Sequence, residues 1–109
     1  MKSKNSFESG DLTDNMFYIL LSLIKPRHGY RIMQFIREET DGKVVIGPAT
    51  MYTTLQKLQE YNLIEEVEGD DNKKVYIATE EGRRLLEENI QRRKKIVELA
   101  EKIIKEGKE

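Results

Sequence analysis

The carboxyl-terminal part of the sequence carries the pattern that most limits what this chain can fold into. Over residues 80–105, apolar side chains recur at helical spacing, which predicts a helix of about 26 residues and about 39 Å. The stripe consists of Leu86, Ile90, Val97, Ala100 and Ile104, and Leu85, Ile96 and Ile103 widen it on one side. A domain of about 75 residues cannot cover so long a helix, so we expect a second copy of the chain to cover it.

Two polar residues, Asn89 and Arg93, lie inside this apolar stripe. Polar groups in such positions either fix the register of paired helices or line a hydrated gap between two chains. The sequence leaves both alternatives open.

Three shorter helices are expected ahead of the long one, at residues 12–24, at residues 28–40 and from Gly47-Pro48 to Tyr61-Asn62. Proline suits the first helical position, and Gly42 and Asn62 are residue types that tolerate the left-handed conformation ending a helix. The β-branched segment 43–46 is expected to be extended. Residues 63–68 and 73–78 flank a polar turn and predict a β-hairpin, after which Thr79 caps the long helix.

The first helix is apolar around most of its circumference, which predicts burial on more than one side. One side is expected to pack within its own domain and the other against a second chain. The residues predicted to form the dimer contact are Met16, Leu20, Leu86, Ile90, Arg93, Val97, Ala100 and Ile104.

The distribution of charge indicates a partner more clearly than its total does. With 19 basic and 20 acidic residues the net charge is −1, which excludes a uniformly basic coat for nucleic acid. However, no acid occurs between Asp41 and Glu60, where the only charges are Lys43 and Lys57. A uniform distribution would place about three acids there. A polyanion bound at this segment would meet little repulsion.

Three helices followed by a hairpin are typical of a winged helix-turn-helix, whose third helix enters the major groove of DNA. The acid-free segment falls on that helix, where hydroxyl, amide and ammonium groups suit base edges and phosphates. The predicted DNA-binding residues are Lys43, Thr50, Tyr52, Thr53, Gln56, Lys57, Lys73 and Lys74. The predicted fold is therefore mainly α (α+β), with a two-stranded wing and a long carboxyl-terminal dimerisation helix.

Other classes of protein find little support. The chain has no cysteine and one histidine, and it contains no phosphate-binding glycine loop or nucleophile-elbow motif, so we expect neither an enzyme nor a cofactor or metal. The amino-terminal residues are polar, and the longest apolar stretch, at residues 16–24, is too short to span a membrane. These features predict a soluble, cytoplasmic protein.

Several motifs also resemble those of PadR-family transcriptional regulators. They are His28-Gly29-Tyr30, the run from Gly47 to Leu58 with Tyr52, Leu55 and Leu58, then Leu63-Ile64, and Val75-Tyr76-Ile77-Ala78-Thr79-Glu80-Glu81-Gly82. The resemblance covers about residues 12–105, and it implies a homodimeric repressor on a palindromic double-stranded DNA operator, often released by a small-molecule effector. It also implies that the long helix pairs with the partner's first and last helices.

The chain departs from the family pattern at two places. Asn62 stands where the family usually has glycine, and the wing tip carries Asp70 and Asp71, which would repel phosphate and leave Lys73 and Lys74 as the wing's DNA contacts. We therefore expect a tail at residues 1–11, a winged-helix DNA-binding domain at residues 12–79 and a dimerisation helix at residues 80–109. The alternative is a winged-helix module for protein interaction or dimerisation that does not bind DNA; a weaker one is a dimer whose main role is ligand sensing.

Overall fold

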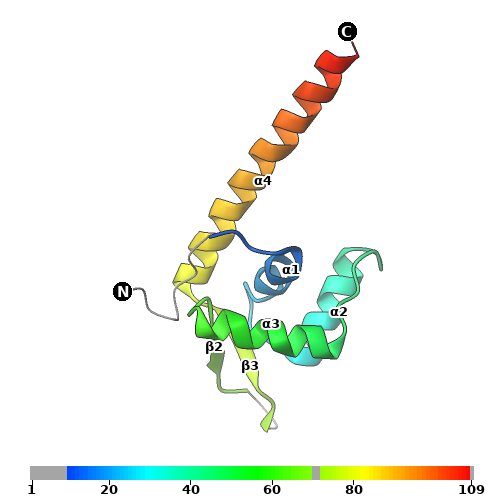
Figure 1. Cartoon of the computed structure of the whole chain (residues 1–109). Helices are drawn as coiled ribbons and strands as arrows, with labels where there is room; N and C mark the ends of the chain where they lie inside the picture. Colours follow the sequence, from blue (N-terminus) through cyan, green and yellow to red (C-terminus); the bar gives the residue numbers. More distant parts are fainter. Residues whose placement is uncertain (1–9, 70–71, 109) are drawn as a thin grey trace.

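The computed structural model describes residues 10–69 and 72–108. Its elements follow one another as α1 (Asp14–Ser22), β1 (Arg27–His28), α2 (Gly29–Glu39), α3 (Pro48–Glu60), β2 (Ile64–Val67), β3 (Val75–Ala78) and α4 (Glu80–Gly107). The first three helices pack together beside a small sheet, and α4 leaves this body as a long arm (Figure 1). The predicted class, a mainly helical winged helix-turn-helix, is confirmed.

The helix ends are the ones that local sequence chemistry favours. The hydroxyl oxygens of Thr13 and Thr79 accept hydrogen bonds from the N–H groups of Met16 and Gly82, at 3.2 and 3.0 Å, and so cap α1 and α4. Beyond α2 and α3 the chain turns through the left-handed region, with φ of +77° at Gly42 and +59° at Asn62. Both terminators were predicted, and an asparagine serves at the second because its side chain tolerates this conformation.

The sheet differs from the prediction in having a third strand. Its order is β1-β3-β2, all antiparallel, with Arg27 opposite Tyr76 and Ile64 opposite Ala78. The extended segment expected at residues 43–46 pairs with none of the strands in the described part of the chain. Instead the Thr40 hydroxyl accepts a hydrogen bond from the N–H of Val44 at 3.0 Å, and Ile46 inserts into the core. The apolar, β-branched residues there anchor a loop instead of forming a strand.

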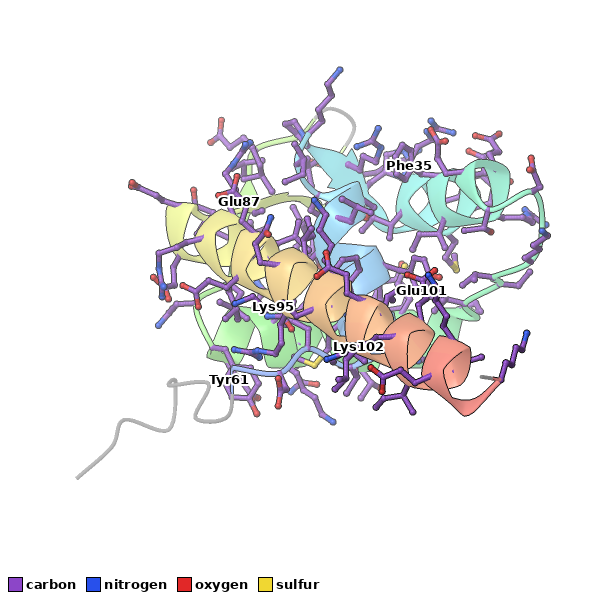
Figure 2. The ribbon with its side chains drawn as sticks, turned by 90° about the horizontal axis from the view of Figure 1, so that it is seen from above. Phe35, Tyr61, Glu87, Lys95, Glu101 and Lys102 are labelled. Carbon is purple, nitrogen blue, oxygen red and sulfur yellow. The ribbon has the colours of Figure 1, made fainter. Side chains whose placement is uncertain are left out.

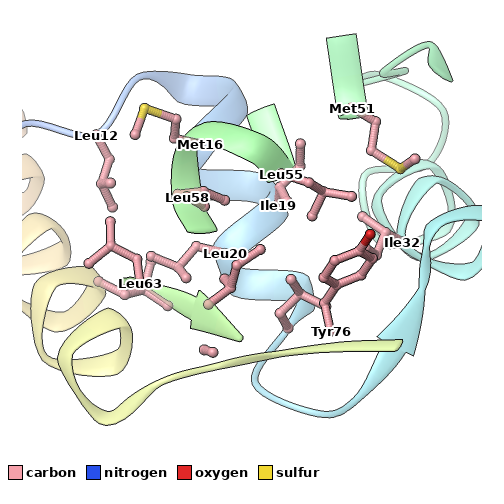
Figure 3. Close-up of a cluster of buried hydrophobic side chains, with 14 of the residues drawn as sticks. Leu12, Met16, Ile19, Leu20, Ile32, Met51, Leu55, Leu58, Leu63 and Tyr76 are labelled. Carbon is pink, nitrogen blue, oxygen red and sulfur yellow. The ribbon is translucent and has the colours of Figure 1, made fainter. Parts of the chain in front are cut away.

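The hydrophobic core lies where α1, α3, the sheet and the start of α4 meet (Figure 3). Helix α1 runs through its centre, which explains why its sequence is apolar on most sides: Ile19, Leu20 and Leu23 are completely buried. The core also fixes the sheet to the helices, because the N–H of Ala78 donates to the carbonyl of Leu23 at 2.8 Å. The wing and α3 are thereby held on one rigid scaffold.

Helix α4 has two distinct parts. Its first turns are buried through Gly82, Leu85, Leu86 and Asn89, whereas all residues from 94 to 108 are exposed. Figure 1 shows this exposed part pointing away from α3 and the wing, and Figure 2 shows Lys95, Glu101 and Lys102 along it. The arm and the wing therefore lie at opposite ends of the molecule.

Candidate nucleic-acid interface

Helix α3 divides its residues between a core face and a solvent face. Its core face consists of Met51, Thr54, Leu55 and Leu58. Its solvent face carries the five α3 residues predicted for DNA contact, Thr50, Tyr52, Thr53, Gln56 and Lys57, and all five are exposed. Because Gly47 and Pro48 begin the helix without a capping side chain, its first backbone N–H groups are also accessible to an acceptor. The exposed face can thus offer hydroxyl, amide and ammonium groups to one surface.

A polar groove of about 430 Å³ separates the start of α3 from the start of α1. Thr50, Thr53 and Lys57 line it from α3, and Thr13 and Asn15 line it from the other side. Neither Thr13 nor Asn15 was predicted to belong to the interface. The groove brings Lys57 together with these four uncharged polar side chains.

Tyr52 connects α3 to the beginning of α2. Its side chain is 55% exposed, yet its hydroxyl lies so close to Gly29 that a Cβ atom there would sit 2.8 Å from the hydroxyl oxygen. The same Cβ would sit 2.9 Å from the Cε of Met51. Glycine in the His28-Gly29-Tyr30 motif is therefore required by the close approach of α3, and Tyr52 is both a surface residue and a packing residue.

Tyr76 of β3 is a core residue that neighbours Ile32 (Figure 3). Burial raises the pKa of the Tyr76 phenol, and the charge of Glu66, directly opposite on β2, raises it further. A smaller contribution comes from Tyr52. The phenol is therefore neutral at ordinary pH and adds no negative charge behind the exposed face of α3.

The remaining predicted DNA contacts surround this helix. Lys43 is exposed in the loop that leads to α3, and Lys73 and Lys74 are exposed at the start of the returning wing segment. Asp70 and Asp71, the acids expected at the wing tip, lie outside the described residues. Within the described parts of the chain, none of these three lysines makes an ion pair.

The predicted dimer residues separate into two groups. Met16, Leu20 and Leu86 belong to the core of the single chain and are buried there by its own side chains. Ile90 is half-buried, and Val97, Ala100 and Ile104 are exposed. Other large apolar residues exposed on the arm are Ile96, Leu99 and Ile103.

Asn89 and Arg93, the two polar residues of the stripe, make contacts within the single chain. Asn89 is buried and hydrogen-bonded to the backbone of residues 10 and 12, and Arg93 binds the carbonyl of Leu12, the carboxylate of Asp14 and the ring of Phe17. Both side chains thus join α4 to the segment that leads into α1.

In the described residues, no helix combines the length and the apolar content needed to cross a membrane. The three-helix body with its wing and its exposed α3 defines a winged helix-turn-helix protein. A model of the transcriptional regulator PadR-like family matches residues 19–88, which is more than half of the sequence. The chain belongs to the PadR-like family.

Individual relatives agree with this assignment. The chain is similar to the transcriptional regulator YqjI of Escherichia coli, with 38% identity over 78 residues. This match covers 72% of the chain but only 36% of YqjI, so the chain spans about a third of that relative's length.

Solved structures share the fold. A PadR family transcription regulator from Clostridium difficile matches with a TM-score of 0.70 and 24% identity, covering 82% of this chain and 97% of the other. A PadR-like transcription factor from Bacteroides fragilis matches with a TM-score of 0.67 and 27% identity, covering 81% and 87%.

Proposed function

We propose that this chain is a DNA-binding transcriptional regulator, a repressor that acts as a homodimer on a palindromic operator. The observation that carries the proposal is the exposed face of α3, which holds polar and basic side chains and no acid from Pro48 to Gln59. A helix of this kind on a winged scaffold fits the major groove, where Gln56 can pair with adenine and Lys57 with guanine or phosphate. The regulators named among its relatives support the same function.

The proposed second copy binds along the arm of α4. Five large apolar side chains there are between 55 and 61% exposed: Ile96, Val97, Leu99, Ile103 and Ile104. A soluble monomer rarely leaves so many clustered apolar residues in water. Pairing of two arms would cover them and display two copies of α3, which a palindrome of half-sites about 34 Å apart requires.

The first experiment measures DNA binding with a matched control. Operator sequences are selected from random DNA, and their affinity is measured for the wild type, Lys57→Ala and Lys105→Ala. Both variants lose one exposed lysine, but only Lys57 lies on α3. We expect Lys57→Ala to weaken binding about tenfold, as loss of one base or phosphate contact does, and Lys105→Ala to leave it unchanged. Equal affinity for all three proteins would contradict the assignment of α3.

Tyr52 needs a finer comparison because it also packs on Gly29. Tyr52→Phe keeps the ring and removes the hydroxyl, whereas Tyr52→Ala removes both. We expect Tyr52→Ala to weaken operator binding and the dimer to stay intact in sedimentation. If Tyr52→Ala binds like the wild type, Tyr52 is a packing residue only.

The wing is tested by the salt dependence of binding. Replacing Lys73 and Lys74 with alanine should reduce the slope of log affinity against log salt by up to about two. The control replaces Lys105, in the last turn of α4, and Lys108, directly after this helix, both of which are exposed. An unchanged slope in the Lys73/Lys74 variant would mean that the wing does not contact DNA.

Two further parts of the proposal have their own tests. Absence of any salt-sensitive retention on a DNA column would favour the alternative, a module for protein interaction without DNA binding. Release of the operator by a small molecule is tested by a thermal-shift screen of planar aromatic compounds, followed by operator binding in the presence of each hit.

A further inference from the structure

The side chain of Asn89 holds a segment of backbone as a neighbouring strand would. It is 3% exposed; its Oδ1 accepts from the N–H of Leu12 at 3.0 Å, and its Nδ2 donates to the carbonyl of Gly10 at 2.8 Å. Nδ2 also donates to the carbonyl of Leu85, one turn earlier on α4, at 2.9 Å. Gly10 has φ of +70°, a conformation that glycine adopts without strain. The segment before α1 is therefore fixed to α4 from both sides of one amide group.

Arg93, one turn further along α4, completes the attachment. Its guanidinium donates to the carbonyl of Leu12 and to the carboxylate of Asp14, each at 3.0 Å, and lies 4.3 Å from the centroid of the Phe17 ring. The ion pair alone would contribute little, since the two side chains are 39% and 79% exposed. The planar guanidinium, however, satisfies three contacts in one geometry, which a flexible ammonium group cannot do.

The position of this attachment gives it mechanical importance. Among the described residues, Arg93 is the last residue of α4 that is not exposed, and the arm projects freely beyond it. About fourteen further residues make the arm about 21 Å long. A swing of about 10° at Arg93 would move its end by about 4 Å, which is close to the spacing of one base pair, about 3.4 Å.

We infer that Asn89 and Arg93 are positioning residues that fix the direction of the α4 arm and thereby the separation of the two α3 helices on an operator. This inference rests on the proposed dimeric DNA-binding function. It goes further in assigning the match between protein and half-site spacing to two side chains that do not touch DNA.

The test compares Arg93→Ala and Arg93→Lys with Arg84→Ala. Arg84 is a matched control because it lies on α4, is exposed, and among the described residues binds only Glu81 and Glu88 of the same helix. Arg93 is chosen over the buried Asn89 because its loss is less damaging to folding. Binding is measured on the selected operator, on operators with one base pair more or fewer between half-sites, and on an isolated half-site.

A second measurement does not depend on DNA or on the dimer. Spin labels are attached through Glu60→Cys at the end of α3 and Glu101→Cys on the arm, in a chain that has no natural cysteine. The distance distribution between the two labels is measured by electron paramagnetic resonance in an excess of unlabelled protein.

We expect Arg93→Ala to bind the full operator about tenfold more weakly, because simultaneous engagement of two half-sites depends on geometry, and to bind the half-site normally. Its discrimination between spacings should fall, its distance distribution should broaden, and Arg93→Lys should be intermediate. Arg84→Ala should match the wild type in every measurement.

An equal loss on the full operator and the half-site, or no change in either, would overturn the inference. If no protein binds DNA, the proposed function fails, and the distance distribution alone decides: a broadened one supports the positioning role and an unchanged one refutes it.

Discussion

Gly82 lies in the first turn of α4, and its replacement by alanine tests how closely this helix packs. Helix propensity predicts that Gly82→Ala stabilises the protein, whereas the packing around Gly82 predicts that it destabilises the protein. A Cβ atom at this position would lie 2.0 Å from the carbonyl oxygen of Leu63, where ordinary contact begins near 3.4 Å. The carbonyl cannot move away easily, because it accepts the N–H of Thr79 at 3.0 Å. Overpacking costs about 1–3 kcal/mol and a lost hydrogen bond about 1, while helix propensity returns at most about 1. With a backbone atom as the obstacle, we expect Gly82→Ala to destabilise the protein by about 3 kcal/mol.

Gly107 on the same helix is the matched control. A Cβ there would have nothing within 4 Å, so Gly107→Ala should be neutral or stabilise by up to about 1 kcal/mol. Urea unfolding at one fixed protein concentration measures both variants. If Gly82→Ala is as stable as Gly107→Ala, α4 does not approach Leu63 this closely in solution. The conclusion that Gly82 has no room for a Cβ atom would then be refuted.

Three further predictions follow from single groups. Thr79→Ala should cost about 1–2 kcal/mol in urea unfolding, because Thr79 caps α4 and also donates to the carbonyl of Asn62, while Thr79→Ser should retain most of that stability. Because the pKa of Tyr76 is raised in the folded protein, the stability that this shift contributes is complete below the unfolded pKa near 10 and is lost as pH rises towards the folded pKa. Above pH 10 the free energy of unfolding should therefore fall less steeply for Tyr76→Phe than for the wild type, and equal slopes would contradict this. A hydrogen bond from Arg84 lowers the pKa of the Glu81 carboxyl, so Arg84→Ala should raise that pKa in an NMR titration, and an unchanged pKa would contradict this contact.

The sequence predicted the helices, the hairpin and the solvent face of α3 because each depends on local chemistry. Pro48, Asn62 and Thr79 act through their own backbone or that of close neighbours, and helical periodicity assigns Lys57 to the exposed face. The third strand could not be predicted in this way, since Arg27 and His28 become a strand only by pairing with residues about fifty positions later.

The same limit explains the roles of Asn89 and Leu86. Periodicity places both on one stripe of α4, but it cannot say which element covers the stripe. The first half is covered by the chain's own core and by the segment before α1, which is seventy-seven positions away from Asn89. Only the second half, with Val97 and Ile104, is left for the proposed second chain.

Arginines and lysines have different roles in this protein, and the difference predicts how DNA binding depends on salt concentration. Six arginines donate to an oxygen of the same chain: Arg27, Arg31, Arg83, Arg84, Arg92 and Arg93. The lysines at the proposed interface, by contrast, make no ion pair within the described residues. A phosphate that binds Lys57 therefore displaces counterions and breaks no internal contact, so salt should weaken DNA binding strongly. Salt should affect the free energy of unfolding much less, because the exposed arginine pairs contribute little to it and four of the six arginines also donate to a backbone carbonyl.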